Sequence, residues 1–104
     1  MSRVPKIGGV EHEILMLLTQ RRERYGLEMV KESDRIKRGS VYVVLDRMEQ
    51  KGWVKSRQEE ITGQAGLPRR LYSIAAPGVA ALRAADAAQQ ELTAFGTRPS
   101  LQGV

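Results

Sequence analysis

The stretch GSVYVVLDRMEQKGWVKSR, residues 39–57, determines how the rest of the chain is interpreted. Its first half is rich in β-branched and aromatic residues, which favour a strand. Its apolar residues, however, follow the i, i+3, i+4, i+7 spacing of one helix face: Val41, Val44, Leu45 and Met48. Lys51 followed by Gly52 is typical of a helix C-terminus. Because burial of two valines outweighs their helix cost of about 0.5 kcal/mol each, we predict a helix that begins near residue 39.

Two further helices are predicted before this stretch. VEHEILMLLTQ, residues 10–20, carries a helical apolar stripe made of Val10, Ile14, Leu17 and Leu18. The polar cluster RRER, residues 21–24, then interrupts the pattern. Residues 26–33, GLEMVKES, form a second short helix whose inward-facing residues are expected to be Leu27, Met29 and Val30.

The segments after Gly52 change from a helical to a strand pattern. WVKSRQE (residues 53–59) and RRLYSIA (residues 69–75) both alternate polar and apolar residues, and the segment between them contains two glycines and a proline. This pattern predicts an antiparallel hairpin. VAALRAADAAQQELTAF, residues 79–95, is an alanine-rich helix, and the segment after it has no periodicity.

The predicted fold is therefore mainly α with a small β-hairpin. Three helices, a hairpin and a last helix are the order of a winged helix-turn-helix followed by one extra helix. We expect a flexible N-terminal arm at residues 1–9 and a winged-helix DNA-binding domain at residues 10–76. A C-terminal dimerisation helix follows at residues 77–95, and a disordered tail at residues 96–104.

Composition and charge narrow the classes of function. No apolar run approaches the roughly 20 residues that cross a bilayer, and the N-terminus lacks the apolar segment of a signal peptide, so a cytoplasmic protein is expected. The chain has no cysteine. Residues 1–74 hold 15 Lys+Arg against 10 Asp+Glu, whereas residues 75–104 hold 2 of each. The whole basic excess therefore lies in the winged-helix part, which favours a polyanionic partner there.

Four sequence elements resemble the PadR-like family of transcriptional regulators. EILMLL is similar to the first-helix pattern ILxLL, and YGLEM to hGYEL in helix two. GSVYVVLDRMEQKGWVKSR resembles GTLYPALxRLExxGLIxSR, and LPRRLYSIAAPG resembles the wing motif xPRKYYxLTxxG. The resemblance covers roughly residues 12–84. MarR regulators share the architecture, but the GSVY and PRRLY elements favour the PadR-like group. Leu27, Lys37-Arg38 and Ala75 depart from the family pattern.

The resemblance implies double-stranded DNA as a partner, with the third helix in the major groove. The expected DNA-binding residues are those on the outer face of this helix, just before it and on the wing: Lys37, Arg38, Gly39, Ser40, Tyr42, Val43, Arg47, Gln50, Arg69 and Arg70. A merely solvated helix face and a solubilising edge hairpin are the alternatives. For Arg57 both roles stay open. Asp46 argues against DNA contact unless it accepts from cytosine or pairs with an arginine.

A homodimer is expected because the last helix carries no basic excess and has an apolar stripe too long for one small domain to cover. The predicted interface joins the first and last helices: Ile14, Leu18, Leu82, Ala85, Gln89, Leu92 and Phe95. The alternative is a last helix folded back on its own domain. Two-fold symmetry implies a palindromic operator.

The remaining predictions concern chemistry and rival functions. No nucleophile–base set or phosphate loop is found, so we predict no enzymatic activity, no metal and no cofactor. His12, the single histidine, is expected at the surface or an interface. A small-molecule effector is left open. The predicted function is a sequence-specific DNA-binding transcriptional regulator, expected to act as a repressor. The rival from another class is a winged-helix adaptor that binds protein and no DNA.

Overall fold

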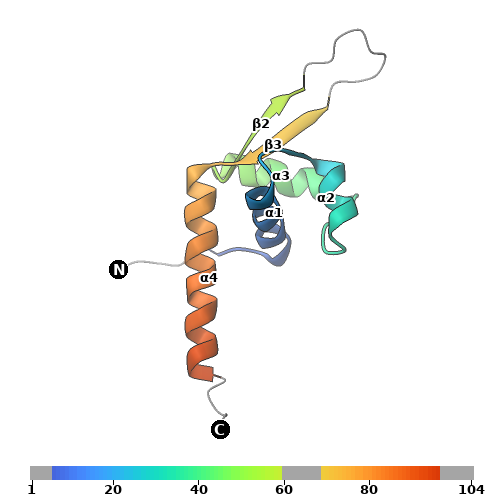
Figure 1. Ribbon diagram of the computed structural model, residues 1–104. Coiled ribbons are helices and arrows are strands. Elements are labelled where there is room, and N and C mark those ends of the chain that lie inside the picture. Colours follow the sequence, from blue (N-terminus) through green and yellow to red (C-terminus); the bar gives the residue numbers. More distant parts are fainter. Residues whose placement is uncertain (1–5, 60–68, 97–104) are drawn as a thin grey trace.

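The computed structural model describes residues 6–59 and 69–96, with side chains described up to residue 90. Figure 1 shows the order of its elements, which are α1 (Gly9–Gln20), β1 (Arg24–Tyr25), α2 (Gly26–Glu32), α3 (Val41–Gln50), β2 (Val54–Gln58), β3 (Arg70–Ile74) and α4 (Ala76–Gly96). The predicted succession of three helices, a hairpin and a last helix is confirmed. None of the helices within the described ranges is long and apolar enough to span a membrane.

The stretch at residues 39–57 contains a helix, as its spacing predicts. Val41, Leu45 and Met48 are fully buried on one side of α3. Gly52 adopts the left-handed conformation at φ +82°, which glycine accepts without steric cost, and its N–H donates to the carbonyl of Glu49 at 2.9 Å. The helix therefore ends where the Lys51-Gly52 pair predicts, and the chain turns directly into β2.

Helices α1 and α2 supply most of the remaining core. Ile14 and Leu15 of α1 and Met29 of α2 have no exposed surface, and Trp53 after α3 is also buried. The prediction for Leu27 was wrong, because this side chain is 37% exposed on the outer side of α2. A helix of seven residues presents only a narrow face to the core, and Met29 and the partly buried Val30 occupy it.

The sheet has one strand more than the predicted hairpin. Its three strands lie in the order β1-β3-β2, all antiparallel, with Arg24 opposite Tyr72 in one ladder and Ser56 opposite Tyr72 in the other. A strand of two residues offers no alternation for a sequence pattern to detect. The last residue of the RRER cluster, Arg24, therefore begins a strand that the sequence pattern did not predict, and it is buried.

The first half of α4 packs on its own domain. Ala81 and Leu82 belong to the core, and Nε2 of His12 on α1 lies 2.7 Å from Oδ1 of Asp86. Gly78 allows the close approach, since a Cβ there would lie 2.2 Å from the carbonyl oxygen of Trp53. Figure 1 shows the second half of α4 running on past α1 and away from the domain.

These contacts correct part of the predicted dimer interface. Ile14, Leu18 and Leu82 are buried within the single chain, at 0%, 2% and 6% exposure. The domain is small, so the start of α4 is needed to cover the apolar face of α1 in the same chain. The alternative of a last helix folded back on its own domain therefore holds for this part of α4.

The domain boundaries differ slightly from those expected. Gly9, expected in the flexible arm, begins α1, and Ile7 is partly buried against the core. α4 begins one residue earlier and ends one residue later than residues 77–95. Residues 1–5 of the expected arm and 97–104 of the expected tail lie outside the described residues.

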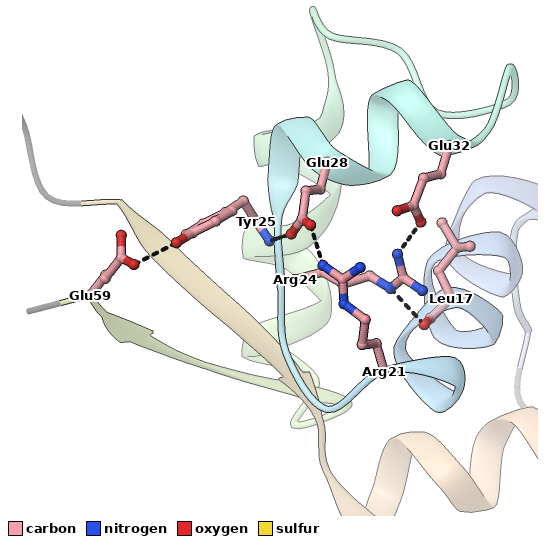
Figure 2. Close-up of polar contacts among 7 residues, drawn as sticks. All are labelled: Leu17, Arg21, Arg24, Tyr25, Glu28, Glu32 and Glu59. Carbon is pink, nitrogen blue, oxygen red and sulfur yellow. Dashed lines mark hydrogen bonds and ion pairs between the residues drawn. The ribbon is translucent and has the colours of Figure 1, made fainter.

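Arg24 joins three elements from a buried position, as Figure 2 shows. Its side chain points inward with 5% exposure; Nε donates to the carbonyl of Leu17 at 2.9 Å, and Nη1 forms an ion pair with Glu32. Leu17 is one of the last four residues of α1, whose carbonyls have no partner within the helix. The guanidinium therefore caps α1, holds the end of α2, and does so from the edge strand of the sheet.

We expect Arg24→Met to lower the free energy of unfolding by about 3 kcal/mol, because a buried carbonyl and a carboxylate lose their partner. Arg21→Met is the matched control, since Arg21 pairs with Glu28 through a side chain that is 54% exposed. Its effect should stay within about 0.5 kcal/mol. Urea denaturation of both variants measures the difference, and equal losses would contradict the role given to Arg24.

Candidate nucleic-acid interface

The turn between α2 and α3 leads into α3, one face of which is exposed. Every residue predicted to contact DNA is exposed, and Tyr42 and Val43, large hydrophobic side chains, are 47% and 57% exposed. Such side chains at the start of an exposed helix face suit contact with bases, where valine can meet a thymine methyl group. Ser40 is the N-cap of α3, and its hydroxyl forms no capping hydrogen bond, which leaves it to act outward.

A hollow of about 520 Å³, here named the α2–wing groove, lies between α2, α3 and the wing strands. Its lining joins residues from four separate stretches of the chain: Tyr25, Leu27, Glu28, Lys31, Arg38, Tyr42, Arg69 and Arg70. Four of the predicted DNA-binding residues meet here. Lys31 and Tyr25 were missed, because Lys31 lies in an ordinary amphipathic helix and Tyr25 in a strand without a pattern.

Tyr42 is placed in this groove by its contact with the start of α2. A Cβ added at Gly26 would lie 2.7 Å from Cε1 of the Tyr42 ring, closer than a side chain allows. Gly26 thus gives the ring room to lie against α2. The tyrosine thereby connects the exposed face of α3 to the groove.

The base of the wing is held by Tyr25. Figure 2 shows its hydroxyl directed at Glu59, to which it donates at 2.5 Å. This hydrogen bond, and secondarily partial burial, raise the pKa of Tyr25, so the phenol stays neutral. The guanidinium of Arg69 lies 4.3 Å from the centre of the Tyr25 ring, and its Nε lies 3.5 Å from Oε1 of Glu59. Arg69 is therefore held at the groove by a ring and a carboxylate.

Arg70 is connected to α3 through a serine. Its Nη1 donates to Oγ of Ser56 at 3.0 Å, and that hydroxyl donates to Oε2 of Glu49 at 2.8 Å. A second hollow of about 830 Å³, the α3–wing groove, lies on this side, lined by Tyr42, Val43, Asp46, Glu49, Gln50, Arg70 and Tyr72. Tyr42 and Arg70 line both grooves and separate one from the other.

Some predicted residues lie apart from the two grooves. Lys37, Gly39, Ser40 and Arg47 line neither of them. Partial burial acts to raise the pKa of Glu11, but a hydrogen bond from Lys51, together with the charge of Arg47, lowers it overall. Arg47 therefore lies close enough to α1 to act on Glu11, at the side of the exposed face.

Arg57, for which two roles were open, forms an ion pair with the carboxylate of Glu23. Its Nε and Nη2 donate to the two oxygens of Glu23 at 2.7 and 2.8 Å. The hydrogen bonds from Arg57 lower the pKa of Glu23, so both groups are charged at neutral pH. A bidentate pair of this kind uses the fork of the guanidinium, and it favours the structural role for Arg57.

An exposed third helix with a cationic hairpin beside it defines a winged helix-turn-helix protein. The model of the PadR-like family of transcriptional regulators matches residues 14–84. The chain belongs to this family of DNA-binding regulators. Its members are transcription regulators, which confirms the prediction that the chain is not an enzyme.

Solved structures resemble the chain over most of its length. A PadR-like transcription factor from Bacteroides fragilis has a TM-score of 0.73 at 22% identity, covering 82% of this chain and 84% of that chain. A transcriptional regulator from Clostridium thermocellum shares 30% identity at a TM-score of 0.64, covering 81% and 84%. A PadR family regulator from Clostridium difficile shares 27% identity at 0.64, covering 82% and 88%. No curated protein sequence matches the chain significantly.

The contacts of Arg70 and Arg57 predict different effects of their removal. Arg70→Ala should weaken binding to all duplexes by a similar factor, on the order of tenfold, because a guanidinium that meets phosphate holds DNA without reading it. Arg57→Ala should change affinity less than about twofold, since Glu23 already engages that side chain. Fluorescence anisotropy with several labelled duplexes measures both. Equal losses for the two variants would contradict this placement of the wing.

Proposed function

We propose that the chain is a cytoplasmic repressor that binds a palindromic operator as a homodimer. In this proposal α3 enters the major groove and the wing arginines lie against the neighbouring phosphates or minor groove. The observation that carries the proposal is the α2–wing groove, in which Lys31, Arg38, Arg69 and Arg70 converge from separate parts of the chain.

The charges of this groove suit a polyanion. Of its lining residues four are cationic and one, Glu28, is anionic. The Glu28 carboxylate accepts hydrogen bonds from Arg21 and from the backbone of Tyr25, so its charge is already balanced by Arg21. Partial burial acts to raise the pKa of Glu28, but these bonds lower it overall. The groove thus keeps a net positive charge toward solvent, which attracts phosphate.

The exposed face of α3 supports a role in recognising the base sequence of DNA. Ser40, the N-cap, and Val43, in the first turn, are exposed at the start of α3, where a helix in the major groove meets base edges. The wing is held to the same helix through Ser56 and Glu49. Phosphate contacts and base contacts would therefore be made by one connected surface, as recognition requires. A protein adaptor has less need of such a cationic groove beside exposed apolar side chains.

The second half of α4 supports the homodimer. The helix has 21 residues and is about 31 Å long, longer than the part that covers α1. Ala85 lies just before the midpoint of α4 and Gln89 just after it, and Leu92 and Phe95 fall where the backbone is helical but the side chains are outside the described residues. Alanines allow a second helix to approach closely. We therefore place the partner on this half of α4 and not on Ile14 or Leu18.

The charged surface predicts a steep dependence of DNA binding on salt. If Lys37, Arg38, Arg47, Arg69 and Arg70 of two subunits meet phosphates, the slope of log K against log salt should reach several units, at about −0.9 per phosphate. Titration of a labelled duplex at increasing salt measures the slope. A flat response, or no binding to any duplex, would favour the protein adaptor.

Truncation tests the dimer. A chain that ends at Gln90 keeps Ala81, Leu82 and Asp86, which hold α4 to the domain, and loses the last part of the helix. We expect it to be monomeric, whereas a chain that ends at Gly96 should dimerise like the full chain. Sedimentation equilibrium at micromolar concentration distinguishes them. A full chain that sediments as a monomer would end the dimer proposal, and with it the palindromic operator.

A further inference from the structure

Asp46 is an acidic residue on the face of α3 that carries the proposed base contacts. It is exposed and lines the α3–wing groove together with Val43 and Gln50. Within residues 6–59 and 69–90 no lysine or arginine forms an ion pair with it, and its hydrogen bond is accepted from Nε2 of Gln50 at 3.2 Å. A carboxylate in this place would be repelled by phosphate, so its presence needs a reason.

Glu49, one turn further along α3, differs from Asp46 because its carboxylate is connected to the wing. Its Oε2 accepts from the hydroxyl of Ser56, which in turn accepts from Arg70. Glu49 thereby serves to position the wing. Asp46 has no such link to the described part of the wing, residues 54–59 and 69–74, and its partner Gln50 is itself exposed on the same face. Both members of the Asp46–Gln50 pair therefore face outward.

We infer that Asp46 determines specificity by accepting a hydrogen bond from the N4 amino group of a cytosine. This inference rests on the proposed entry of α3 into the major groove. A carboxylate only accepts hydrogen bonds, and in the major groove only cytosine N4 and adenine N6 donate them. Adenine carries the acceptor N7 beside N6, which repels the second carboxylate oxygen. Cytosine has no acceptor on that side, so it is preferred.

Gln50 strengthens the match to a C·G pair. Its amide nitrogen has two hydrogens, of which one is donated to Asp46. The other hydrogen can be donated to O6 of the guanine, which lies next to cytosine N4 on the groove edge. Asp46 and Gln50 together thus present an acceptor beside a donor. Asp46 also fixes which way the Gln50 amide points, because only its nitrogen can donate to a carboxylate.

The test selects bound sequences from a random duplex pool with the wild-type chain, Asp46→Asn and Asp34→Asn. The wild type should select a cytosine at one position of each half-site. Asp46→Asn should lose this preference by on the order of tenfold and shift it toward adenine, because an amide can pair with N6 and N7 together. Asp34→Asn removes the same charge from an exposed position in the turn between α2 and α3 that lines neither groove, and it should keep the cytosine. Anisotropy with duplexes that differ at this one pair gives the ratio of affinities, and thermal unfolding confirms that each variant is folded.

Two results would overturn the inference while DNA binding stands. One is an unchanged selected sequence with Asp46→Asn, including the case where it binds every duplex more tightly, since Asp46 would then only repel phosphate. The other is loss of the same cytosine with Asp34→Asn, which would make it an effect of total charge. A wild-type chain that retains no duplex would instead overturn the proposed function, and this inference would fall with it.

Discussion

The buried guanidinium of Arg24 is the contact on which the arrangement of the domain depends. It closes the end of α1 through the carbonyl of Leu17 and pairs with Glu32 at the end of α2, while its own backbone is in the sheet opposite Tyr72. A charge taken out of water is stable only when its hydrogen bonds are satisfied, so the position of each element constrains the others. α2 in turn sets the place from which the chain enters α3.

Tyr25, the residue after Arg24, connects this arrangement of helices to the wing. Successive side chains of a strand point to opposite faces, so Arg24 faces the core and Tyr25 faces the wing. Tyr25 holds Glu59 by a hydrogen bond and supports Arg69 on its ring. A two-residue strand thus connects the packing of the helices to the position of a cationic side chain in the α2–wing groove.

On the exposed surface near the wing, acidic side chains determine the positions of several arginines. Glu23 pairs directly with Arg57, and Glu49 connects to Arg70 through Ser56, so acidic residues near the wing hold both of these arginines in place. The same logic makes Asp46 informative, because its partner is an amide on the exposed face and not a cation. The two halves of α4 also differ in their surroundings. The first half completes the core, and the second half extends beyond it.

Spacing along the sequence was sufficient for the features that depend on neighbouring residues. The i, i+3, i+4, i+7 pattern identified α3 despite its valines, Gly52 marked its end, and alternation identified β2 and β3. The outward face of α3 followed from the same periodicity, and its predicted residues are exposed. Only the tertiary structure decided features that join distant segments. Burial of Arg24, the strand β1, the place of Lys31 and Arg69 in one groove, and the packing of α4 against α1 all depend on elements brought together in space, which local periodicity does not encode.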